Sequence, residues 1–228
     1  MKIKSIQVSC RNLALTRPYT ISYKTIRQVE NVIAVVELEN GITGLGAANP
    51  SRQVVGEDVK DTLKALQSGA LERFHRQDIR ALHLLLAELR QTFPENPGAA
   101  AAIDIALHDA FTRFIGIPLA VFLGQRITTL PTSITIGIKN NRETLAEAQE
   151  YYRRGFRILK IKLGNSLEND LERLIRLHEI YKNKMKLRVD ANQGYTPTEV
   201  IKFYDKIKSL DIELIEQPLP ARAMNEMK

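Results

Sequence analysis

Two lysines and two carboxylates stand near the ends of consecutive apolar segments. Lys160 and Lys162 lie in "RILKIKLG", Asp190 lies in "LRVDAN" and Glu216 lies in "ELIEQP". Aliphatic runs of this kind are typical of buried strands, and residues two apart on a strand point to the same face. Burying two neighbouring ammonium groups is costly. The pattern therefore indicates that the lysines take part in chemistry.

Together these side chains suit removal of a proton next to a carboxylate. Asp190 and Glu216 offer hard oxygen ligands, which fit Mg²⁺ better than zinc or copper. Positive charge lowers the pKa of a nearby lysine, so we expect one amine to be neutral and to act as a general base. The other lysine would hold that pKa down, and the metal would stabilise an enediolate.

Regular alternation of strands and helices should bring these residues together. From about residue 131, strand and helix patterns alternate about every thirty residues, which predicts parallel strands with helical crossovers. Thr196 is the expected N-cap of one helix, before Pro197. In a β/α barrel the active site lies at the carboxyl ends of the strands. Thr135, in "TSITIGI", would join the lysines and carboxylates there.

Each residue also has a simpler explanation. A carboxylate such as Asp190 can cap the next helix, and Glu216 can be a solvated loop residue. Lysines at a strand end can extend into solvent, and Thr135 is an ordinary strand residue. We favour the catalytic interpretation because the polar residues stand at the same level of consecutive strands.

The N-terminal part has a different pattern. Strands are predicted in "IKSIQVSC" and "NVIAVVELEN", followed by three helical segments, which indicates an α+β module over residues 1–125. Between the two strands, "LTRPYTISYKTIRQVE" is predicted to be a long functional loop.

Composition restricts the partners and the compartment. The 228 residues carry a net charge of +7, but the basic residues are interleaved with acidic ones, so we expect no nucleic-acid partner and a mild attraction for carboxylate substrates. We expect no membrane association, because apolar runs and a signal peptide are lacking. Cys10 is the only cysteine, which excludes an intrachain disulfide and favours the cytoplasm.

Three motifs carry a family resemblance. "LKIKLG", "LRVDANQGY" and "LIEQPL", in this order, resemble the enolase superfamily in its muconate lactonizing enzyme-like branch, and most of all the dipeptide (L-Ala-D/L-Glu) epimerases. "AAIDIALHDAFTRFIGIPLAVFLG" is similar to the helix and linker between that branch's two domains. The resemblance implies an α/β fold with a capping domain over 1–125, followed over 126–228 by the first four strands of a (β/α) barrel.

The resemblance also implies roles for the candidate residues. Lys162 would be a proton-transfer base, Lys160 its electrostatic partner, and Asp190 and Glu216 the first two Mg²⁺ ligands, while Thr135 would contact the substrate.

Three further positions follow from the same resemblance. Lys24, or Arg27 in the same "YKTIR" segment, would meet a side-chain carboxylate of the substrate. Asn192 and Gln217 would support the metal ligands from behind.

The sequence departs from the family in length. A barrel of this family has about eight strand–helix units, and we predict four strands, so the third metal ligand and the second base are missing. We expect a truncated epimerase-like enzyme. The alternatives are a fragment of a longer enzyme, or a half barrel that pairs with a second copy or a partner. An open half barrel exposes strand edges, which favours a homo-oligomer.

Other functions remain open. A muconate cycloisomerase or an o-succinylbenzoate synthase could work with the Lys162 side alone, and a catalytically dead remnant is the non-enzymatic alternative.

Overall fold

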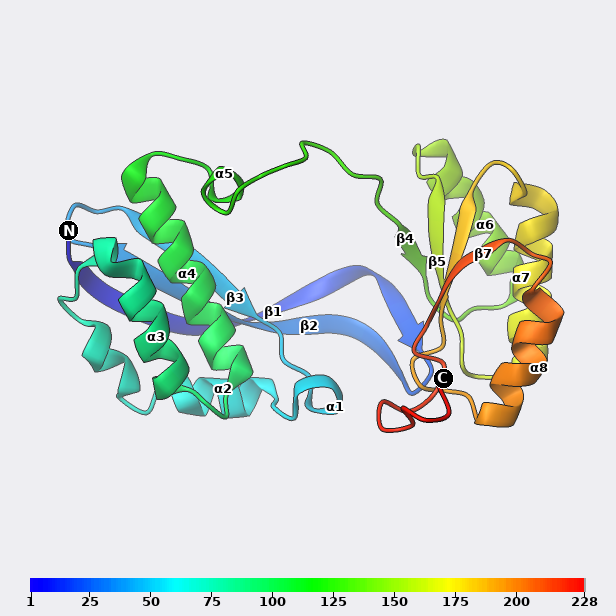
Figure 1. The fold of residues 1–228 in the computed structure, drawn as a ribbon, viewed down its shortest axis with the longest axis horizontal. Helices are drawn as coiled ribbons and strands as arrows, with labels where there is room; N and C mark the ends of the chain where they lie inside the picture. The colour runs from blue at the N-terminus through cyan, green and yellow to red at the C-terminus, as the bar shows by residue number, and fades with distance from the viewer. Residues whose placement is uncertain (228) are drawn as a thin grey trace. The chain divides into compact units, whose positions relative to one another are not determined.

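The structure, a computed structural model, describes residues 1–227 and divides into two compact units. The first consists of Met1–Leu15 and Gln28–Thr128; the second consists of Thr16–Arg27 and the chain from Thr129 onward. Figure 1 labels the helices and strands. No helix in the described part of the chain has both the length and the apolar character needed to cross a membrane.

The first unit is an α+β module built on a three-stranded sheet in the order β1-β2-β3. The sheet contains β1 (Ile3–Ile21), β2 (Lys24–Leu38) and β3 (Thr43–Ala48), and the end of β1 and the start of β2 belong to the second unit. The helices of the first unit are α1 (Arg52–Val55), α2 (Val59–Leu66), the 3₁₀ helices η1 (Ala70–Phe74) and η2 (Ile79–Ala81), α3 (Leu82–Thr92), α4 (Pro97–Ile115) and α5 (Leu119–Phe122). The inner face of the sheet and the apolar faces of α3 and α4 form one buried core.

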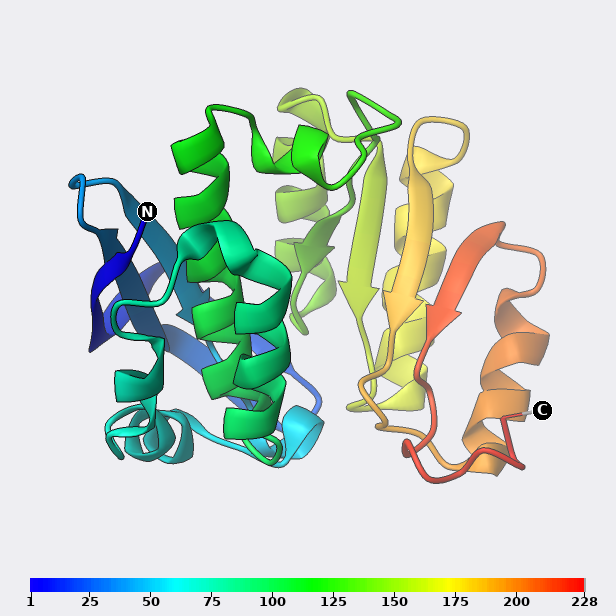
Figure 2. The same ribbon diagram turned by 60° about the vertical axis from the view of Figure 1, so that its left-hand side comes forward.

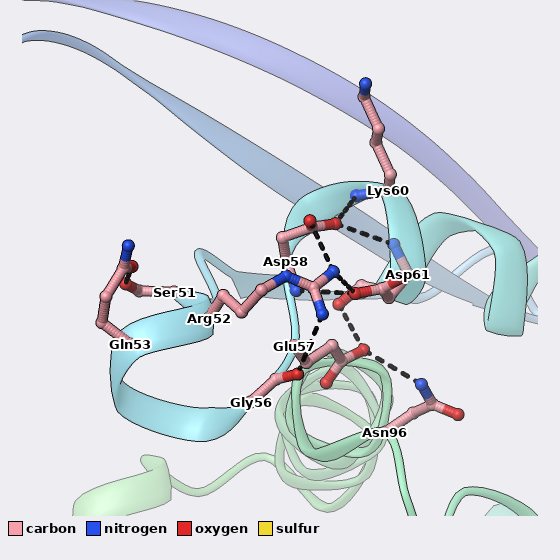
Figure 3. Close-up of polar contacts among 10 residues, drawn as sticks. Ser51, Arg52, Gln53, Gly56, Glu57, Asp58, Lys60, Asp61 and Asn96 are labelled. Carbon is pink, nitrogen blue, oxygen red and sulfur yellow. Dashed lines mark hydrogen bonds and ion pairs between the residues drawn. The ribbon is translucent and has the colours of Figure 1, made fainter.

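Buried Glu57 fixes the start of α4. Its carboxylate accepts hydrogen bonds from the Thr62 hydroxyl (2.6 Å), the Gly98 amide (2.7 Å) and the Asn96 side chain. An amide at a helix N-terminus lacks a partner within the helix, and a carboxylate is favoured there. The close-up in Figure 3 shows Glu57 beside Asn96, with Arg52 near the start of α2.

The second unit contains four parallel strands in the order β4-β5-β6-β7. They are β4 (Ile134–Ile136), β5 (Ile158–Lys162), β6 (Lys186–Asp190) and β7 (Ile212–Glu216), and the crossover helices are α6 (Asn141–Arg153), α7 (Leu167–Tyr181) and α8 (Pro197–Ile207). The three helices cover the same face of the sheet (Figures 1 and 2). The predicted α/β fold, an α+β module followed by parallel β/α units, is confirmed.

Local sequence signals define these units. Leu159, Ile161 and Val189 are fully buried in the core beneath the helices. Thr196 caps α8 as predicted, and it forms a reciprocal capping box with Glu199.

The prediction of a long loop between the first two strands is wrong. β1 continues to Ile21 and β2 begins at Lys24, so only Ser22 and Tyr23 form the turn. Polar residues such as Thr20 and Thr25 are compatible with a strand, because a hairpin arm exposes much of its surface. The hairpin tip, Thr16–Arg27, belongs to the second unit.

Candidate active site

Strand register aligns the predicted site residues on one face of the parallel sheet. Lys162 lies opposite Asp190, and Asp190 lies opposite Glu216. Two residues earlier along β5, Lys160 lies opposite Thr135. Neighbouring residues in register point to the same side of a sheet, and alternate residues share a face. These five side chains therefore share the face opposite the one that carries the buried aliphatic residues.

The lysines and carboxylates contact one another directly. Lys162 Nζ donates to Asp190 Oδ2 at 2.6 Å. Lys160 Nζ lies 3.0 Å from the same oxygen and 2.5 Å from Glu216 Oε2, so it bridges the two carboxylates. Asp190 is 2% exposed and Lys162 is 8% exposed, whereas the Glu216 side chain is 45% exposed. The result is a buried carboxylate between two amines, with a second carboxylate at the open side.

The surroundings shift the pKa values of this group. Burial alone would raise the pKa of Asp190, but hydrogen bonds from Lys162, Lys160 and the Asn192 amide bring it below its ordinary value. Burial would lower the pKa of Lys160, but Glu216 and Asp190 outweigh it, and the net pKa is raised.

From the sequence we expected Lys160 to be the charged electrostatic partner of the base Lys162. In the structure Lys160 has two carboxylates within ion-pair distance, and their effect on its pKa outweighs the effect of burial.

The loops after β6 and β7 hold the two carboxylates differently. Asn192 has a left-handed backbone conformation with a φ of 46°. Its backbone amide donates a hydrogen bond to Asp190 Oδ1 at 2.9 Å. Its side-chain oxygen Oδ1 is buried and has no hydrogen-bond partner among the described residues. Gln217 instead donates its side-chain amide to the Leu219 carbonyl oxygen, within its own loop. The structure thus brings Asn192 to the site, whereas the Gln217 side chain turns to its own loop.

Thr135 and Lys24 occupy less constrained positions. Thr135 is half-buried and lies beside Lys160 in the sheet. Lys24 is exposed, as is Arg27, and the Lys24 ammonium lies 5.8 Å from the centre of the Tyr23 ring. The tip of the same hairpin reaches the site through Ser22, whose hydroxyl donates to the Asn192 carbonyl oxygen at 3.2 Å.

Sequence reasoning missed a buried network that supports the end of β5. Arg173 donates to the Lys162 carbonyl oxygen (3.0 Å) and to Asp170 (2.5 Å). Asp170 also accepts from the Gly164 amide and from the Tyr195 hydroxyl, and burial together with Asp170 raises the pKa of Tyr195. The available signal was an aspartate and an arginine three residues apart in "NDLERL", a spacing that places them side by side on a helix.

The donor set fits a hard cation, although it is incomplete. Both Asp190 and Glu216 converge on the Lys160 ammonium, which shows that their oxygens can share one centre of positive charge. Carboxylate oxygens are the protein ligands that Mg²⁺ prefers. Within residues 1–227, however, no group of three or more His, Cys, Asp or Glu side chains is arranged to hold a metal.

Comparison with known families assigns the chain. Residues 3–124 match the mandelate racemase / muconate lactonizing enzyme N-terminal domain, which is more than half of the chain. The chain belongs to the mandelate racemase / muconate lactonizing enzyme family. Residues 143–228 match the enolase C-terminal domain-like family, so the resemblance seen in the three motifs is confirmed.

Several proteins similar to this chain are named as dipeptide epimerases. An L-Lys-D/L-Arg epimerase from Desulforapulum autotrophicum is 50% identical over 227 residues, which are 100% of this chain and 64% of that protein. An L-Ala-D/L-Glu epimerase from Bacillus subtilis is 30% identical over 96% of this chain and 61% of its own length.

A solved structure of a dipeptide epimerase is also similar to this chain. The dipeptide epimerase from Methylococcus capsulatus, crystallised with Mg and the dipeptide L-Arg-D-Lys, matches with a TM-score of 0.94 and 43% identity. The match covers 99% of this chain and 64% of the other. The chain therefore spans somewhat less than two thirds of the length of these relatives.

Proposed function

We propose that this protein is a Mg²⁺-dependent epimerase of dipeptides. The observation that carries the proposal is the contact of Lys160 and Lys162 with buried Asp190, beside Glu216 on the next strand. The dipeptide epimerases among the relatives support the same reaction class.

Lys162 is the proposed general base. Lys162 is 8% exposed, and its amine lies 2.6 Å from Asp190 Oδ2, so it has a defined direction from which to take the α-proton of a bound dipeptide. Lys160, whose pKa is raised, stays cationic and stabilises the negative charge that develops on the substrate carboxylate. Thr135, beside Lys160, contacts the same part of the substrate.

Asp190 and Glu216 are the proposed magnesium ligands, and Asn192 would support Asp190 through the hydrogen bond from its backbone amide. When bound, Mg²⁺ supplies further positive charge next to the substrate carboxylate. The ion would also take the carboxylate oxygens away from the lysines.

Epimerisation also needs a base on the opposite face of the α-carbon, because a proton is removed on one face and returned on the other. The described amines of the site both lie on β5 and therefore serve one face. In this proposal the second base and a third metal ligand come from outside the four described strands.

For the substrate we propose a cationic dipeptide of the L-Lys-D/L-Arg type. Two relatives of this specificity, at 50% and 44% identity, support it more strongly than the L-Ala-D/L-Glu epimerase at 30% identity supports an L-Ala-D/L-Glu substrate. An L-Ala-D/L-Glu substrate would give Lys24 the role of binding a side-chain carboxylate. A cationic dipeptide has no side-chain carboxylate, so Lys24 would have no such role in binding it.

Deuterium incorporation at the α-carbon in D₂O tests the reaction. With the protein at its natural length and Mg²⁺ present, we expect exchange into L-Lys-L-Arg and little into L-Ala-L-Glu. Lys162→Ala should abolish exchange, while Lys186→Ala, which removes an exposed lysine of β6, should not. Exchange that survives Lys162→Ala would exclude Lys162 as the base.

A β-elimination reaction is the second candidate. It requires a base on only one side, and both described lysines of the site lie on one strand. Conversion of a muconate or of an o-succinylbenzoate precursor, without exchange into any dipeptide, would favour a cycloisomerase or synthase. If calorimetry detects no Mg²⁺ binding, the protein is instead a catalytically dead remnant.

A further inference from the structure

The hairpin tip, Thr16–Arg27, is attached to the loops that follow β4 and β6. The Ile138 amide donates to the Thr20 carbonyl oxygen at 2.9 Å, immediately after β4. Gly137 is buried so close to the hairpin that an added Cβ would lie 3.0 Å from the same Thr20 oxygen. Ser22 supplies the contact to the loop after β6, through the Asn192 carbonyl oxygen.

Asn192 stands between the hairpin and Asp190. Its backbone carbonyl oxygen accepts the hydrogen bond from Ser22, and its backbone amide donates the hydrogen bond to Asp190 Oδ1. The residue between these two peptide groups has a φ of 46°, a left-handed conformation that residues other than glycine adopt at a cost. Asparagine tolerates this conformation better than most residues, but contacts on both sides are needed to hold it.

The two hydrogen bonds therefore support each other. If the hairpin leaves, the Asn192 carbonyl loses its partner, and the left-handed conformation that aims the amide at Asp190 is less favoured. If Asp190 changes orientation, the Asn192 backbone amide loses its hydrogen-bond acceptor, and the left-handed conformation is again less favoured. The link from the Ser22 hydroxyl to Asp190 therefore runs through Asn192.

We propose that Ser22 and Asn192 are positioning residues that couple attachment of the hairpin tip to cation binding at Asp190. The inference rests on the proposed role of Asp190 as a metal ligand. Coupling of this kind is reciprocal: if the attached hairpin strengthens cation binding by some factor, the cation strengthens attachment of the hairpin by the same factor.

The test measures both sides of the coupling on the protein at its natural length. Titration calorimetry gives the Kd for Mg²⁺, and amide hydrogen exchange of residues 16–27, with and without Mg²⁺, reports attachment. In the wild type, Mg²⁺ should slow exchange of these amides. Ser22→Ala, which removes one neutral hydrogen bond, should weaken Mg²⁺ binding and reduce the protection, each by about 2- to 10-fold.

Two further variants separate coupling from general loosening. Thr25→Val removes a hydroxyl from the same hairpin, where the Thr25 hydroxyl lies 2.9 Å from the Thr20 hydroxyl, and it should leave the Kd for Mg²⁺ unchanged. Gly137→Ala pushes against the Thr20 backbone without changing a polar group near Asp190, and it should weaken Mg²⁺ binding as Ser22→Ala does.

The outcomes distinguish this inference from the proposed function. The inference is overturned if Mg²⁺ gives no protection to the wild-type hairpin, or if Ser22→Ala and Thr25→Val give the same Kd. If protection and its loss in Ser22→Ala are observed while dipeptides show no exchange, the coupling stands and the epimerase proposal fails.

Discussion

Lys162 and Asp190 form a buried ion pair between the carboxyl ends of two neighbouring strands, with 2.6 Å between Lys162 Nζ and Asp190 Oδ2. Both side chains are nearly excluded from solvent. The attraction between the two opposite charges offsets the cost of burying each of them. Lys160 and the Asn192 backbone amide complete the hydrogen bonding of the carboxylate. A change at Asp190 therefore affects stability as well as chemistry.

We expect Asp190→Asn to lower the free energy of unfolding by about 3–5 kcal/mol, because it leaves the buried Lys162 ammonium without its counter-charge. Glu216→Gln removes the other carboxylate, but that side chain is half exposed, and the loss should be within about 1 kcal/mol. Urea denaturation of the two variants measures the difference. Equal losses would show that burial does not determine the strength of these pairs.

The arrangement of the site was predictable because it follows from periodicity. Lys160 and Lys162 share a face because they are two residues apart, and the repeated strand–helix order places Asp190 and Glu216 on the next two strands. Neither inference needs knowledge of distant contacts. The same reasoning yields the cap at Thr196.

Two features that depend on contacts between residues distant in sequence were not predictable. The raised pKa of Lys160 requires knowing that two carboxylates from other strands reach its ammonium. The hairpin tip belongs with residues more than a hundred positions later, as the Ser22 contact to Asn192 illustrates. No local pattern in "PYTISYK" indicates such a partner.

Close packing of the loops after β5 and β6 gives a second prediction. Gly164 has a φ of +95°, and a Cβ there would overlap the Ala191 carbonyl oxygen. Gly155 has the same φ with open space around it, so Gly155→Ala isolates the backbone cost of about 1–2 kcal/mol.

We expect Gly164→Ala to be destabilising by more than about 4 kcal/mol, because the steric overlap adds to the backbone cost. Thermal or urea unfolding of the two variants provides the comparison. Similar values for both would mean that the loops move apart readily.

Tyr151 should make the protein sensitive to alkaline pH. Burial, together with a 2.6 Å hydrogen bond from its hydroxyl to Glu147, raises its pKa from 10.0 to about 12. Because the folded protein holds this proton more tightly, the stabilisation is fully present below pH 10 and is lost as the pH rises towards 12. Two pKa units correspond to roughly 2–3 kcal/mol.

Stability curves of wild type and Tyr151→Phe should therefore converge as the pH approaches 12, after correction for the other tyrosines. Tyr23→Phe, at an exposed tyrosine, is the matched control. If Tyr151→Phe has the same pH dependence as the wild type between pH 10 and 12, the hydroxyl is not protected as described.

The Lys160 ammonium would compete with Mg²⁺ for the carboxylate oxygens of Asp190 and Glu216. We therefore predict that removing its charge strengthens Mg²⁺ binding and weakens catalysis. The ammonium lies within 3.0 Å of both Asp190 and Glu216. Lys160→Met keeps the length of the side chain and removes the charge. A like charge within roughly 4 Å costs between about 1 and 4 kcal/mol, depending on the effective dielectric constant, so Mg²⁺ should bind at least about fivefold more tightly to the variant.

Exchange of the substrate α-proton should nevertheless fall in Lys160→Met, because the cation that neutralises the developing negative charge is lost. Calorimetric Mg²⁺ titration and deuterium incorporation, measured on the same preparation, give both values, with Lys186→Met as a control at an exposed lysine. Weaker Mg²⁺ binding in Lys160→Met would show that Lys160 helps to form the metal site. Unchanged exchange would remove Lys160 from the proposed mechanism.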